Sequence, residues 1–215
     1  CLNNIQDAKN FTDTLVNARK ATWVIELPAG VQLDPLYLWR LAKESVSAPD
    51  TCAFFVDDDC HDAEGNRHSP RFKPGVNPAA LQSSDLSGPI CARREAWLDS
   101  GGGSFRSGSP WFLKLLQLAN RFGWGAVKHI PDVLLSYPDK FPSDVESCLV
   151  ALVESQMREG IASEIVPVTS QSWNIRYPLS TTPTITIAIL SQGQRDYLPR
   201  CFDSIIGKTD YRHLE

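Results

Sequence analysis

The main feature of the hydrophobic pattern is an apolar run at 52–56 that ends at three consecutive aspartates, 57–59. Its aromatic and β-branched residues are typical of a buried strand. A turn pattern follows at 63–66, and the basic, proline-rich segment at 67–78 has the composition of a loop. We therefore expect a strand whose carboxyl end delivers acidic side chains toward a cationic loop.

The residues before this run alternate between helical and strand patterns. Residues 11–20 have helical spacing, 22–27 are typical of a short buried strand, and Asp34-Pro35 has the N-cap and first-turn pattern of a helix. The order helix, strand, helix, strand favours a parallel α/β sheet. We expect the apolar residues of this helix and the aromatic residues of the strands in the core: Leu36, Leu38, Trp39, Leu41 and Ala42, with Trp23, Phe54 and Phe55.

Further elements follow the basic segment. The pattern predicts a loop or short helix around Leu81, a strand leading into a helix at 90–97, and a helix at 111–121. An extended, largely buried segment is expected at 127–135 and a helix at about 144–158.

A polar, proline-containing stretch at 169–183 is the best candidate for a domain boundary. The β-branched run at 184–190 then predicts a new strand, and 197–206 an amphipathic helix. We predict a first domain at 1–168, a linker, and the opening of a second α/β domain at 184–215. No partner strand for this second domain is expected within the chain.

Composition and charge exclude several classes of protein. The 215 residues carry a net charge of −4, which argues against non-specific binding of nucleic acid. No apolar run reaches the roughly 18 residues that a membrane-spanning helix needs.

The six cysteines form no C-x-x-C pair and are interpreted as reduced, mostly structural thiols. Cys60-His61 lacks the second Cys/His pair of a zinc site. The chain begins at Cys1, and we expect it to be a piece of a longer protein.

Charged residues around the apolar run supply the candidate chemistry. Ligands of open α/β sheets bind beyond the carboxyl ends of the strands, where Asp57 and Asp59 would meet Arg67, Arg71 and Lys73. Carboxylates suit a metal ion or sugar hydroxyls, and the basic side chains suit phosphate oxygens. The alternatives are a solvated acidic turn for the aspartates and pairing with those aspartates for the basic residues. Ligand binding and pairing are compatible with each other.

Several motifs form a set that covers nearly the whole chain. F-V-D-D-D at 55–59 is followed by G-x-R-x-x-P-x-F-K-P at 65–74, H-I-P-x-V-L at 129–134 and P-T-I-T-I at 183–187. This set resembles bacterial family 2 glycosyltransferases of the rhamnosyltransferase-like, tandem-domain type, which assemble cell-surface polysaccharides. The last motif is similar to the connection into their second domain.

The resemblance implies a GT-A fold, an α/β fold that binds nucleotide-sugars, of which this chain would hold the acceptor-side part. It implies transfer of a sugar from a nucleotide-sugar donor to a saccharide or lipid-linked acceptor. A divalent cation, Mg²⁺ or Mn²⁺, would sit at the donor's diphosphate. A cytoplasmic location is also implied, with peripheral contact of the longer protein with the inner face of the membrane.

The sequence departs from this family at the positions that carry its chemistry. Pro28-Ala29-Gly30 stands where the family has a metal-binding Asp-x-Asp, Ser109-Pro110-Trp111 where it has the presumed catalytic aspartate, and Leu135-Ser136-Tyr137 where it has a histidine. No catalytic residue is therefore assigned, and Asp57 and Asp59 are left as candidate metal ligands. The alternative function is a catalytically inactive glycan- or partner-binding domain of a multidomain glycosyltransferase.

The sequence leaves the roles of one histidine and two tryptophans undecided. His129 lies in an apolar context and is either a substrate-binding residue or a core histidine with its hydrogen bonds satisfied. Trp111 and Trp124 are expected in the core, with stacking on a sugar ring as the alternative.

Overall fold

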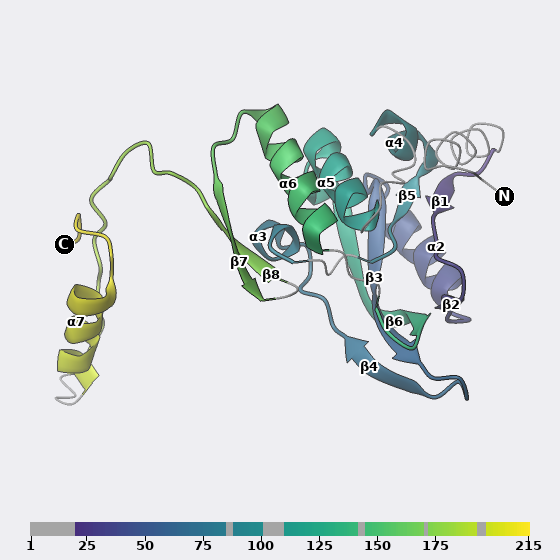
Figure 1. Ribbon diagram of the computed structural model, residues 1–215, viewed down its shortest axis with the longest axis horizontal. Coiled ribbons are helices and arrows are strands. Elements are labelled where there is room, and N and C mark those ends of the chain that lie inside the picture. Colours follow the sequence, from purple (N-terminus) through teal and green to yellow (C-terminus); the bar gives the residue numbers. More distant parts are fainter. Residues whose placement is uncertain (1–19, 85–87, 101–109, 142–144, 170–171, 193–196) are drawn as a thin grey trace. The chain divides into compact units, whose positions relative to one another are not determined.

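In a computed structural model, the chain forms two compact units, residues 1–176 and 177–215 (Figure 1). Each unit is described by itself. The structure describes residues 20–84, 88–100, 110–141, 145–169, 172–192 and 197–215. Its elements in chain order are β1 (Trp23–Ile25), β2 (Gln32–Leu33), α2 (Tyr37–Ser47), β3 (Ala53–His61), β4 (Arg67–Arg71), α3 (Pro78–Gln82), β5 (Cys91–Arg93), α4 (Arg94–Asp99), α5 (Pro110–Phe122), the 3₁₀ helix η1 (Trp124–Ala126), β6 (Val127–Pro138), α6 (Val145–Glu159), β7 (Glu164–Thr169), β8 (Ser172–Arg176) and α7 (Tyr197–Lys208).

Strand β3 is the centre of a six-stranded mixed sheet in the first unit. The order is β1-β5-β3-β6-β2, with β4 also paired to β3. The predicted α/β class is confirmed, but the prediction of a parallel sheet is wrong. Only β3 and β6 run parallel among the described strands of this sheet. Strand β4 returns through a tight turn with Gly65 at a φ of 86°, and a turn this short joins only antiparallel strands.

Strand β3 does not end before the aspartates, as the sequence pattern predicted. It continues through them to His61, because β6 pairs along the whole of this stretch and β4 pairs with its last residues. The basic segment that follows begins as strand β4 and is not entirely a loop. Pro70 is tolerated there because β4 is an edge strand, where a missing N–H breaks no ladder between neighbouring strands.

Two apolar faces of the sheet are covered by different helices (Figure 1). Phe54 and Val56 pack in one cluster with Tyr37 and Leu41 of α2. Phe55 packs in the other cluster, which holds residues of α3, α4 and α5. The alternation of side chains along β3 therefore builds both halves of the core. Trp111 is buried in the second cluster, and Trp124 packs against it, as predicted.

The apolar side of α2 differs from the prediction. The helix begins at Tyr37, and its buried residues are Tyr37 and Leu41, one turn apart on the same face. Leu38 and Trp39 lie off this stripe and are 67% and 57% exposed. Leu36 precedes the helix as its N-cap residue and is also exposed. Ala42 is exposed as well, so the core role predicted for these four residues is wrong.

Helix α6 packs on α5 and on the β7–β8 hairpin in a third apolar cluster. Trp173 of β8 is buried there, and its indole N–H donates to the carbonyl of Gln82 at 2.7 Å. The linker expected at 169–183 thus contains a strand of the first unit. The boundaries of the predicted domains remain a prediction.

The second unit contains α7, which matches the predicted amphipathic helix. The run at 184–190 forms an isolated bridge between Ile185 and Leu214 and not a full strand. Ile185 and His213 are joined by a backbone hydrogen bond of 2.9 Å, and Ile187 donates to Glu215 at 2.7 Å. The last residues of the chain pair with this run, but they form no partner strand among the described residues.

Candidate functional site

The three aspartates of β3 are buried. Asp57, Asp58 and Asp59 are 3%, 0% and 5% exposed. The prediction of a solvated acidic turn is therefore wrong. A carboxylate removed from water is costly unless it is paired and hydrogen-bonded, so the partners of these three residues define the site.

Asp58 is held by two basic side chains. The Arg71 guanidinium donates from Nε to Oδ1 and from Nη2 to Oδ2, both at 2.8 Å. The Lys73 ammonium lies 2.7 Å from Oδ2. The paired N–H groups of the guanidinium match the carboxylate plane, which is the strongest geometry for such a pair. Arg71 also stacks on the Phe141 ring at 4.0 Å, which covers the pair from one side.

The side chain of Lys73 is fully buried, with an exposed fraction of 0%. Burial lowers the pKa of its ammonium to about 8, although the negative charge of Asp58 opposes this shift. Gly88 lies directly against the pair. A Cβ at this position would lie 2.9 Å from Asp58 Oδ2 and 3.0 Å from Lys73 Nζ, and the backbone has a φ of +61°. The close approach and the left-handed conformation both require glycine.

Asp57 makes a separate set of contacts. Its Oδ1 accepts the backbone N–H of Lys73 at 2.9 Å and lies 2.7 Å from His129 Nε2. The parallel register places His129 beside Phe55, and the two rings stack at 4.9 Å. His129 is therefore oriented by a carboxylate and by an aromatic ring. Its role in substrate binding remains a prediction.

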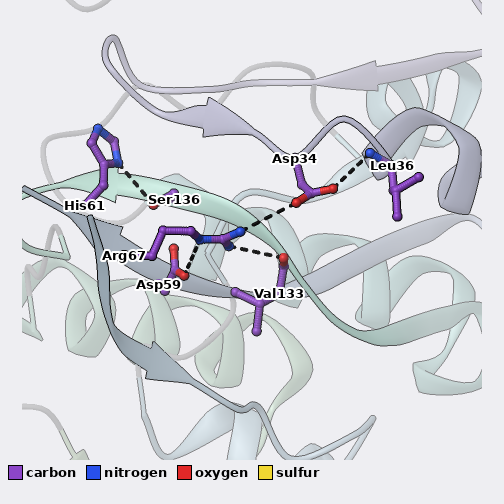
Figure 2. Close-up of polar contacts among 7 residues, drawn as sticks. All are labelled: Asp34, Leu36, Asp59, His61, Arg67, Val133 and Ser136. Atoms are coloured by element: carbon purple, nitrogen blue, oxygen red, sulfur yellow. Dashed lines mark hydrogen bonds and ion pairs between the residues drawn. The ribbon is translucent and has the colours of Figure 1, made fainter. Parts of the chain in front are cut away.

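Asp59 is paired with Arg67 at the end of the sheet (Figure 2). Arg67 Nε donates to Asp59 Oδ2 at 2.6 Å, while Nη1 reaches Asp34 Oδ2 at 3.5 Å and Nη2 reaches the carbonyl of Val133 at 3.2 Å. Asp34 in turn accepts the backbone N–H of Leu36 at 2.9 Å, just before α2 begins. One guanidinium thus joins β3, β6 and the segment between β2 and α2.

A second polar group lies at the same end of the sheet and was not found by sequence reasoning. His61 Nδ1 lies 3.0 Å from Ser136 Oγ, and His61 Nε2 lies 3.2 Å from Gln32 Nε2. These residues belong to β3, β6 and β2, which are neighbours in the sheet but far apart in sequence. Asp34 was missed as a site residue for the same reason. Only knowledge of the strand order would have revealed them.

The predicted pairing of basic residues with the aspartates is confirmed, and little free positive charge remains. Three basic side chains, those of Arg67, Arg71 and Lys73, are paired with three carboxylates, those of Asp34, Asp58 and Asp59. Arg67 is the most exposed of the three, with 43% of its side chain accessible, compared with 21% for Arg71. A ligand arriving from solvent would meet Arg67 first.

Asp57 and Asp59 do not fit a shared divalent cation in this arrangement. Mg²⁺ and Mn²⁺ need several oxygen ligands, whereas Asp57 Oδ1 accepts two hydrogen bonds and Asp59 Oδ2 is paired with Arg67. Within the described ranges, no three His, Cys, Asp or Glu side chains group as metal ligands. The metal role of these two residues stays a prediction, against which their contacts argue.

The position where the family has its catalytic aspartate is only partly described. Ser109 lies outside the described residues, and α5 begins at the next residue, Pro110. Where the family has a histidine, Ser136 contacts His61.

Comparison with known proteins gives one informative relative. No protein-family model matches the chain. The O-antigen biosynthesis protein RfbC of Myxococcus xanthus is 26% identical over 224 residues, which cover 97% of this chain and 17% of that protein. The chain thus spans less than a fifth of this relative. In the described part of the chain, no helix is long and apolar enough to span a bilayer. Along nearly its whole length, then, the chain is similar to one part of a larger O-antigen biosynthesis protein.

Proposed function

We propose that this chain is part of a family 2, GT-A-type glycosyltransferase that acts in cell-surface polysaccharide synthesis. The reaction would transfer a sugar from a nucleotide-sugar donor to a saccharide or lipid-linked acceptor. The observation that carries the proposal is the match over 97% of the chain to a protein named for O-antigen biosynthesis. The motif set at 55–59, 65–74 and 129–134 supports the same family.

The geometry supports a ligand site at the carboxyl end of β3. In α/β sheets this is where ligands bind, and here β3 and β6 run parallel and end together. The Arg67 side chain is 43% exposed at this edge, and His129 is oriented by Asp57. Within the proposed reaction, Arg67 binds the ligand from solvent. Arg71 and Lys73 offset the buried charge of Asp58 and so stabilise the end of β3.

A divalent cation would stabilise the departing diphosphate in such a reaction. Because Asp57 and Asp59 are engaged with other partners, we derive no step through a metal at these residues. Binding of the donor diphosphate to this part of the longer protein would therefore rely on fixed basic side chains, chiefly Arg67.

A second candidate function is favoured by the ion pairs themselves. All three aspartates of β3 are already paired or hydrogen-bonded, and no described carboxylate in the site stands free as a base. This arrangement suits a catalytically inactive domain that binds a glycan or a partner, with the chemistry performed elsewhere in the longer protein.

Calorimetric titration of UDP and dTDP into this chain and into the natural full-length protein tests the proposal. We expect the full-length protein to bind one of the two nucleotides and the Arg67→Ala variant to bind it at least tenfold more weakly. Arg176→Ala is the matched control, since Arg176 and its partner Glu164 are both 68% exposed at a distance of 3.7 Å. Nucleotide binding that ignores Arg67→Ala would favour the second candidate.

A further inference from the structure

The Arg67 guanidinium lies among three oxygens from three different segments (Figure 2). They are a carboxylate oxygen of Asp59 on β3, a carboxylate oxygen of Asp34 before α2, and the backbone carbonyl of Val133 on β6. Each of the three nitrogens of the guanidinium contacts one of them. Carboxylate and carbonyl oxygens are among the ligands that hard divalent cations take in proteins, where water molecules complete the coordination of Mg²⁺.

A second observation indicates that these oxygens form a site for a positive charge. Asp59 Oδ1 is fully buried and has no hydrogen-bond partner among the residues that the structure describes, and the Asp59 side chain as a whole is only 7% exposed. A buried carboxylate oxygen without a partner is costly. The negative charge at this position is thus only partly satisfied by hydrogen bonds, and the Arg67 guanidinium is the positive charge that offsets it.

We propose that Arg67 is the resident cation of an oxygen cage formed by Asp34, Asp59 and Val133. In the wild-type protein the guanidinium fills the cage, and this end of the sheet takes no divalent metal. When the guanidinium is removed, the three oxygens close on a divalent cation, at the metal–oxygen distances of about 2.0–2.6 Å that such ions take. The positive charge at this edge of the sheet is thus that of a side chain, and it does not depend on the concentration of metal ions.

This inference does not rest on the proposed function, because it concerns only the charges of the cage. It also differs from the predicted metal site at Asp57 and Asp59. The residue that joins Asp59 here is Asp34, from a distant part of the sequence, and the occupant is a side chain.

The experiment is a titration of Mn²⁺ into this chain, followed by the electron paramagnetic resonance signal of the free ion. We expect the wild-type chain to bind no Mn²⁺ at this position. We expect Arg67→Ala to bind one equivalent, and the Arg67→Ala/Asp59→Asn double variant to lose that equivalent. Arg176→Ala, which removes an exposed arginine on β8, is expected to behave as the wild type.

A thermal measurement covers the case in which Arg67→Ala is weakly folded. Mn²⁺ is expected to raise the melting temperature of Arg67→Ala and of the milder variant Arg67→Gln, and to leave that of the wild type unchanged, as linkage requires for a site present only in the folded state. Three outcomes overturn the proposal. They are Asp59-dependent Mn²⁺ binding by the wild type, absence of Mn²⁺ binding by both Arg67 variants, and failure of Mn²⁺ to raise the melting temperature of either.

Discussion

A single carboxylate, that of Asp58, is paired with two basic side chains that are partly or wholly removed from water. Its burial could not be foreseen, because three consecutive aspartates after an apolar run normally mark the end of a strand. What sequence reasoning did anticipate was the pairing of these acids with the basic residues that follow. It could not assign individual partners, since these depend on the register of β3 against β4.

Replacement of Asp58 by asparagine is expected to destabilise the fold by about 3–5 kcal/mol, because it leaves Arg71 and the buried Lys73 without their counter-charge. Urea denaturation followed by circular dichroism measures this change. Glu64→Gln, an exposed change in the turn between β3 and β4, is the control and is expected to match the wild type. An Asp58→Asn protein as stable as that control would show that the ion pairs contribute little.

The pKa of Lys73 predicts a dependence of stability on pH. Burial lowers this pKa to about 8, below the usual 10.5. Between these two values the unfolded chain holds a proton that the folded chain has released, so the Lys73 contribution to the free energy of unfolding increases as the pH rises. From pH 8 to pH 9.5 the increase is expected to be about 1–2 kcal/mol.

Lys73→Met isolates this contribution. The variant keeps the Arg71–Asp58 pair and the backbone N–H that donates to Asp57. Other groups, such as Cys91, whose pKa burial raises to about 12, titrate alike in both proteins and cancel in the difference. Denaturation curves of the wild type and of Lys73→Met at pH 8 and pH 9.5 measure how their difference in stability changes with pH. A stability difference that stays constant over this range, or changes in the opposite direction, would contradict the assignment.

Among the elements, helices were predicted well and strand boundaries less well. Helices α5, α6 and α7 follow apolar spacings that persist over several turns. Strand β4 was not predicted, because Pro70 and the basic residues disfavour a strand locally and only its pairing with β3 forms it. The antiparallel direction of β1 and β5 was missed for a related reason, since strand direction is set by how the chain returns, which apolar spacing does not encode.

The buried face of α2 gives a test of element packing. Leu41 is 7% exposed and contacts the apolar cluster of Phe54, whereas Leu38 is 67% exposed on the same helix. Leu41→Ala is expected to lower the free energy of unfolding by about 2–5 kcal/mol, and Leu38→Ala by less than about 0.5 kcal/mol. Thermal melts of both variants measure the difference. Equal effects would mean that α2 packs through another face.

The whole chain combines a first unit that carries the candidate site with a second unit built from α7 and the pairing of Ile185 with the end of the chain. The motif set in the sequence pointed to polysaccharide synthesis, and the relative named for O-antigen biosynthesis is consistent with it. The donor, the acceptor, the cytoplasmic location and peripheral membrane contact remain predictions. The comparison covers 17% of that relative and tests none of them.

Transfer of sugar by the natural full-length protein decides whether this chain belongs to a working glycosyltransferase. Nucleotide-sugars are supplied with a saccharide acceptor, and mass spectrometry follows the mass of the acceptor in the wild type, Arg67→Ala and Arg176→Ala. The account predicts that the wild type and Arg176→Ala add a sugar, and that Arg67→Ala adds it at least tenfold more slowly while its circular dichroism spectrum is unchanged. Equal rates in all three proteins, or no transfer by the wild type from any nucleotide-sugar, would contradict it.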